Sequence, residues 1–114
     1  MVGHLVLYEF KPGLPPGERQ RFADTLRAAL ASIDEVRSIR LGRRIAIGAG
    51  YEPGDSDGFS WFALLEFADA DGLRAYLEHP AHAELARLFW ESSARTLVQD
   101  FEIADGAAPP RHWI

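Results

Sequence analysis

The chain of 114 residues contains no cysteine, which excludes disulfide bonds, thiolate metal ligands and a cysteine nucleophile. Basic residues are also few: 12 Lys and Arg stand against 17 Asp and Glu, giving a net charge of −5. This balance argues against nucleic acid and against an anionic membrane surface as partners. No apolar run approaches the ~20 residues that span a bilayer, and no signal peptide is recognisable. We therefore expect a cytoplasmic protein.

Motifs for metals and phosphates are missing as well. The sequence holds no H-E-x-x-H pattern and no EF-hand spacing. The glycine-rich stretch at residues 48–58 does not follow the G-x-x-x-x-G-K-[ST] pattern of a phosphate-binding loop. We expect neither a metal site nor a cofactor.

Periodicity and turn residues predict the order of the elements. Strands are expected at residues 4–11, 36–47, 59–67 and 96–103, and helices up to about residue 33, at 69–78 and at 81–95. Gly42 interrupts the second strand and suggests a bulge or a close backbone approach. The order β-α-β-β-α-β, with the second helical region split at Pro80, predicts an α+β ferredoxin-like plait. Residues 1–103 form one domain in this interpretation, and residues 104–114 form a C-terminal tail.

The first and third strands are apolar on both faces. Alternation places His4, Val6 and Tyr8 on one face of the first strand, and Leu5 and Leu7 on the other. A plait with helices on one face would leave the second apolar face in water, which is an aggregation hazard. The simplest resolution is a homodimer in which two sheets pack face to face.

Three side chains that can donate or accept a proton lie within seven residues: Tyr76, His79 and His82. Pro80 lacks an N–H and disfavours a helical residue before it, so one helix should end near His79 and another should begin at Pro80. Such a junction can aim Tyr76 and His82 at a common point. In the alternative interpretation Tyr76 packs in the core, and the histidines cap helices or face water.

Four segments together resemble the stress-responsive dimeric α/β-barrel (Dabb) domain family. They are H-L-V-L-Y-E-F-K at residues 4–11, I-D-E-V at 33–36 running into L-G-R at 41–43, Y-L-E-H-P-A-H at 76–82 and L-V-Q-D-F at 97–101. The resemblance spans nearly the whole chain. It implies a plait that dimerises through its sheets into an α+β barrel, in agreement with the apolar faces.

One kind of family member, the olivetolic acid cyclases, folds a linear polyketide thioester without a cofactor. Similarity to that enzyme implies that Tyr76 and His82 are a catalytic pair. It also matches His4 and His79 to two further histidines, and Trp90 to an aromatic residue of the pocket wall.

A pocket between the sheet and the helices could exclude water and hold an apolar tail. The residues expected to line it are Val6, Tyr8, Phe22, Leu26 and Trp90, with His79 as a further substrate contact. In such a site neutral His82 could take a proton from a carbon flanked by carbonyls, while Tyr76 donates a hydrogen bond to the oxygen. His4 could orient a substrate or hold the tautomer of His82. Tyr8 is bulkier than its counterpart in the cyclase and could fill the pocket.

Three functions remain open from the sequence. The first is a homodimeric stress-responsive protein that binds a small, largely apolar molecule, without an assigned activity. The second is a cofactor-independent, polyketide cyclase-like enzyme with His82 as base and Tyr76 as acid or oxyanion donor. The third, by fold analogy alone, is a cofactor-free monooxygenase. An open apolar cavity that reaches His82 would favour the second function over the first.

Overall fold

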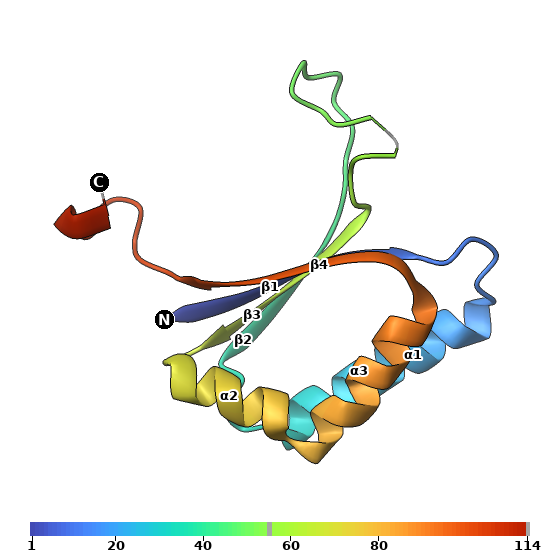
Figure 1. Ribbon diagram of the computed structural model, residues 1–114, viewed down its shortest axis with the longest axis horizontal. Coiled ribbons are helices and arrows are strands. Elements are labelled where there is room, and N and C mark those ends of the chain that lie inside the picture. Colours follow the sequence, from blue (N-terminus) through green and yellow to red (C-terminus); the bar gives the residue numbers. More distant parts are fainter. Residues whose placement is uncertain (55, 114) are drawn as a thin grey trace.

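Within the residues that the computed structural model describes, 1–54 and 56–113, one sheet carries three α-helices on a single face (Figure 1). In chain order the elements are β1 (Val2–Phe10), α1 (Pro16–Ser32), β2 (Ser38–Arg43), β3 (Trp61–Phe67), α2 (Ala70–Glu78), α3 (Pro80–Ser92), β4 (Ser93–Glu102) and the short 3-10 helix η1 (Arg111–Trp113). The predicted α+β ferredoxin-like plait is therefore confirmed.

The sheet has the strand order β2-β3-β1-β4, and every neighbouring pair is antiparallel. β1 lies inside the sheet, where His4 pairs with Leu65 of β3 and with Asp100 of β4. Successive residues of a strand point to opposite faces, so these three side chains share one face. The buried state of His4 and Leu65 identifies it as the face that the helices cover.

The helix junction forms at Pro80 as predicted. His79 has an extended backbone with φ −68° and ψ 138°, ends α2 and precedes α3. Its Nδ1 accepts a hydrogen bond from the backbone N–H of Ala81 at 3.0 Å, so the imidazole caps α3. Asp69 caps α2 in the same way, because its carboxylate accepts from the Gly72 N–H at 2.9 Å. Short polar contacts thus fix where each helix begins.

Several predicted boundaries were wrong, and three of the differences follow from strand pairing. The helix predicted at 81–95 ends at Ser92, since Ser93 and Arg95 pair with β1. The second strand, predicted at 36–47, ends at Arg43, where its partner β3 begins at Trp61. The third strand therefore starts two residues later than its predicted start at residue 59.

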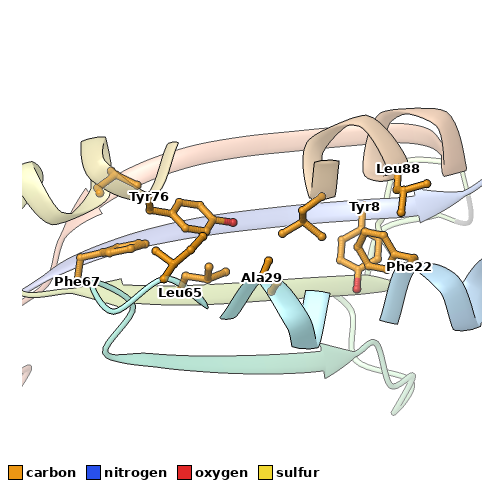
Figure 2. Close-up of a cluster of buried hydrophobic side chains, with 11 residues drawn as sticks. Tyr8, Phe22, Ala29, Leu65, Phe67, Tyr76 and Leu88 are labelled. Carbon is orange, nitrogen blue, oxygen red and sulfur yellow. The ribbon is translucent and has the colours of Figure 1, made fainter. Parts of the chain in front are cut away.

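Figure 2 shows the core as side chains gathered between the sheet and the helices. Tyr8 lies beside Phe22 of α1, with ring centroids 6.2 Å apart. Farther along the sheet Tyr76 of α2 lies over Phe67, with centroids 5.3 Å apart. These two aromatic groups hold the helices against the sheet at separate places, and the space between them is where a cavity can form.

The other face of the sheet has no helix on it among the described residues. The apolar side chains on this face, called the open face below, are Leu5, Leu7, Phe62, Leu64, Leu97 and Phe101. The first four are half-buried, while Leu97 and Phe101 remain 43% and 47% exposed. Both faces of β1 and β3 are apolar, as the sequence predicted. The helices cover one of these faces and leave the other uncovered.

Gly42 marks a close approach rather than a bulge, because the pairing of β2 with β3 has no register shift there. A Cβ atom at Gly42 would lie 1.8 Å from the ring of Phe62, its cross-strand partner. The missing side chain therefore leaves the space that the Phe62 ring occupies.

We predict that Gly42→Ala lowers the free energy of unfolding by about 1–3 kcal/mol, because the Phe62 ring must move. Gly17→Ala in α1 is the matched control, since no atom lies within 4 Å of its added Cβ. That control should leave the stability unchanged or raise it by about 0.4–1 kcal/mol. Equal free energies of the two variants in urea titrations would contradict the prediction.

Candidate functional site

A cavity of about 460 Å³ lies between the covered sheet face and the helices. Strand β1 contributes His4, Val6 and Tyr8 to its wall, and α1 contributes Phe22 and Leu26. The remaining lining residues are Ala63, Leu65, Tyr76, Leu77, His82, Leu85, Ala86, Phe89, Trp90, Thr96, Leu97 and Val98. The cavity wall contains no Lys or Arg, and His4 and His82 are its two side chains that can carry a positive charge. The wall therefore suits a neutral, largely apolar molecule.

All but one of the site residues expected from the sequence line this cavity. His4, Val6, Tyr8, Phe22, Leu26, Tyr76, His82 and Trp90 are among them. His79 is the exception: it is absent from the wall and caps α3 instead. Trp113 does not line the cavity either, and Figure 1 shows the C-terminal segment extending away from the helices.

Tyr76 and His82 meet across the helix junction. Their ring centroids lie 4.7 Å apart in an edge contact, although the two residues belong to different helices. The ring of His4 contacts Tyr76 from the sheet side, with centroids 5.8 Å apart. Three side chains able to donate or accept a proton therefore gather at one end of an apolar cavity.

Asp100 holds His4 in place. The Nδ1 atom of His4 lies 2.6 Å from the carboxylate of Asp100, its cross-strand partner on β4. A carboxylate accepts hydrogen bonds, so the proton of this contact lies on Nδ1.

Burial changes the protonation of the other two groups. Burial raises the pKa of Tyr76 to about 12, so its hydroxyl keeps its proton and acts as a hydrogen-bond donor. Burial, and then the proximity of His4, lower the pKa of His82 below its usual 6.5. A hydrogen bond to the Leu77 backbone opposes this shift. His82 is therefore neutral at pH 7.

The neutral ring of His82 has one nitrogen that carries a proton and one that is free to accept a proton. A group able to take a proton therefore lies beside the Tyr76 hydroxyl, which keeps its own.

Aromatic side chains close the opposite end of the cavity. Tyr8 contacts Phe22 and Phe89, with ring centroids 6.2 and 5.6 Å apart. Tyr8 narrows this end but does not fill the cavity, whose wall still includes both Phe22 and His82. At the surface Trp90 is 57% exposed and stands against Phe89, so it marks the mouth of the cavity.

Sequence reasoning placed His82 and Trp90 of α3 at the site but missed the rest of the contribution of this helix. Its lining residues His82, Leu85, Ala86 and Phe89 recur at intervals of three and four, which is the spacing of one helix face. That spacing was visible once His82 was taken as an anchor. The contact between Asp100 and His4 could not be seen, because it depends on the register of two strands 96 residues apart.

The described residues contain no group of three or more His, Cys, Asp or Glu side chains placed to hold a metal ion. Nor does any helix in this part of the chain have the length and apolar character to cross a membrane.

Comparison with solved structures shows the same fold in several proteins. Hydroxynitrile lyase from Passiflora edulis matches with a TM-score of 0.78 at 17% identity, covering 95% of this chain and 96% of that one. A dimeric ferredoxin-like protein of unknown function from Thermobifida fusca matches with a TM-score of 0.70 at 20% identity, covering 90% of each chain. At these identities the likeness concerns the fold.

Sequence comparison identifies the family. The stress-response A/B barrel domain-containing protein HS1 of Arabidopsis thaliana is 24% identical over 101 residues, covering 89% of this chain and 88% of HS1. The model of the stress responsive A/B barrel domain, Dabb, matches residues 2–103. Because this match includes every strand and all three α-helices, the chain belongs to the stress responsive A/B barrel (Dabb) family.

Proposed function

We propose that this protein is a homodimer in which each subunit binds a small, largely apolar molecule in the cavity between sheet and helices. The observation that carries the proposal is the cavity itself, about 460 Å³ in volume, with polar groups at one end and aromatic groups at the other. An elongated ligand with a polar head would place the head beside Tyr76 and His82 and its tail toward Phe22. The absence of Lys and Arg from the wall favours a neutral head over a carboxylate or phosphate.

A pair of alanines on α3 provides a test of this binding. Ala86 lines the cavity, whereas Ala83 is exposed on the same helix. We predict that Ala86→Trp fills the cavity and weakens binding of the neutral fluorophore N-phenyl-1-naphthylamine at least tenfold. Ala83→Trp adds the same side chain outside the cavity and should leave the affinity unchanged. The proposal is wrong if the wild type shows no saturable fluorescence increase, or if both variants bind alike.

A second candidate function is proton transfer without a cofactor, and the contact between Tyr76 and His82 favours it. In this scheme the unprotonated nitrogen of His82 takes a proton from a carbon next to a carbonyl. The electron pair of the broken C–H bond moves to the carbonyl oxygen, where the Tyr76 hydroxyl donates a hydrogen bond to the developing charge. The resulting enolate could then form or break a carbon–carbon bond. The lyase of Passiflora edulis has the same fold, which makes an enzyme on this scaffold reasonable by analogy alone.

The exchange of carbon-bound hydrogen measures this step directly. A β-dicarbonyl compound with an apolar tail, followed by NMR in D₂O, should lose its central C–H signal faster with protein than in buffer. His82→Ala should slow the catalysed exchange by about 10²–10⁴-fold and Tyr76→Phe by about 10²–10³-fold. His112→Ala is the control, because His112 is exposed in η1 and lies outside the cavity wall. A large fall in Tm for His82→Ala, without catalysed exchange in the wild type, would instead assign His82 to packing.

The pH dependence of this exchange has a definite sign. His82 acts as a base only in its neutral form, and its pKa lies below 6.5. The catalysed rate should therefore rise with pH, reach half of its maximum below pH 6.5 and stay level through neutral pH, where Tyr76 remains protonated. An inflection above pH 6.5 would exclude His82 as the base.

The dimer follows from the open face, whose apolar side chains need a cover. The protein of Thermobifida fusca that shares this fold is described as dimeric, which supports the proposal. A second copy can cover the same patch of each subunit about a two-fold axis.

We predict that light scattering gives twice the monomer mass of 12.7 kDa at micromolar concentration. Phe101→Asp places a charge on the open face and should weaken the dimer at least tenfold, while Phe101→Leu keeps an apolar contact and should have a smaller effect. A wild-type monomer at these concentrations would contradict the dimer.

A further inference from the structure

The connection between β2 and β3 forms a projecting arm, defined here as residues 44–54 and 56–60. It continues the strand pair for one step, since the Arg44 N–H donates to the Ser60 carbonyl at 2.8 Å. Beyond that point it is shaped by Glu52, whose carboxylate accepts from the N–H groups of Ile47 and Ala49 at 2.6 and 3.2 Å. These two hydrogen bonds lower the pKa of Glu52. The arm therefore has a structure of its own.

The base of the arm is fastened to the open face. Glu9 and Arg95 are cross-strand partners on β1 and β4, and alternation places both on the same face as Leu7 and Leu97. The Glu9 carboxylate accepts from the Ser60 N–H, and Arg95 donates to the Gly58 carbonyl. The Arg95 guanidinium also lies over the ring of Phe59, 4.4 Å from its centroid. Glu9 and Arg95 thus hold residues 58–60, at the base of the arm, on the open-face side of the sheet.

Figure 1 shows the result, with the green arm and the helices on opposite sides of the sheet. The arm consequently stands beside the space that the second subunit of the proposed dimer would fill. It does not fold back over its own cavity, whose wall contains no residue of the arm.

Large apolar side chains are exposed along the arm. Ile45 is 73% exposed and Ile47 is 68% exposed. Tyr51, at 83%, is the most exposed large hydrophobic residue in the described part of the chain. Arg44 at the start of the arm is its one basic residue in the sequence, while Glu52 and Asp57 are acidic. This charge disfavours an anionic membrane surface, which recruits basic side chains. An apolar partner surface next to the arm suits these side chains better.

We infer that the arm is a dimerisation clasp that packs Ile45, Ile47 and Tyr51 on a second copy of this chain. The inference rests on the proposed dimer and adds a contact that the packing of two sheets does not require. Under two-fold symmetry each subunit would supply one arm and receive one, so the clasp contributes twice to the association.

The dissociation constant of the dimer, measured by analytical ultracentrifugation, tests the clasp. The double variant Ile47→Asp/Tyr51→Asp should raise this constant at least tenfold. Ser56→Asp adds a negative charge at an exposed polar position of the same arm and should change the constant less than twofold. A dimeric wild type whose affinity the double variant leaves unchanged would overturn the clasp and leave the dimer standing. A monomeric wild type would overturn both.

A second measurement does not depend on the folding of the charged variants. Because the chain has no cysteine, a spin label on Tyr51→Cys reports from that position alone. Its spectrum should be immobilised at dimer concentrations and become mobile on dilution, while a label on Ser56→Cys should be mobile at both. A label at position 51 that stays mobile in a confirmed dimer would overturn the clasp.

Discussion

The alternation of side chains along β1 separates the cavity side of the sheet from the open face. His4, Val6 and Tyr8 point into the cavity, whereas Leu5, Leu7 and Glu9 point to the open face. Because β1 lies inside the sheet and pairs on both sides, its neighbours must adopt the same division. The cavity and the face proposed for subunit association therefore lie on opposite sides of one strand, a single residue apart in sequence.

The second constraint is the break at Pro80. In a continuous helix, at about 100° per residue, the side chains of residues 76 and 82 would point in directions about 120° apart around the helix axis. The break lets α2 and α3 change direction and brings both rings to the same end of the cavity. One proline thus sets the position of the His82 imidazole beside Tyr76.

Much of the architecture could be predicted from the sequence because it is encoded locally. The proline junction, the Asp69 cap and the two apolar faces of β1 all follow from neighbouring residues. What escaped prediction depends on pairing between distant segments. Ser93 and Arg95 belong to a strand because β1 offers them partners, and Asp100 meets His4 only through the register of that pairing. The same holds for the cavity: eight of its expected residues line it, while His79 was assigned to it through resemblance and serves as a cap instead.

The direct passage from α3 into β4 has an evolutionary consequence. Ser92 ends the helix and Ser93 begins the strand, so no connecting loop is available to absorb a change of length. A one-residue insertion or deletion here that the register shift opposite Glu9 and Phe10 did not absorb would turn the β4 side chains to the opposite face. Asp100 would leave His4, and Phe101 would turn toward the helices. Length variation in related proteins that keep this site should therefore accumulate in the arm and the C-terminal segment, while the α3–β4 junction keeps its length.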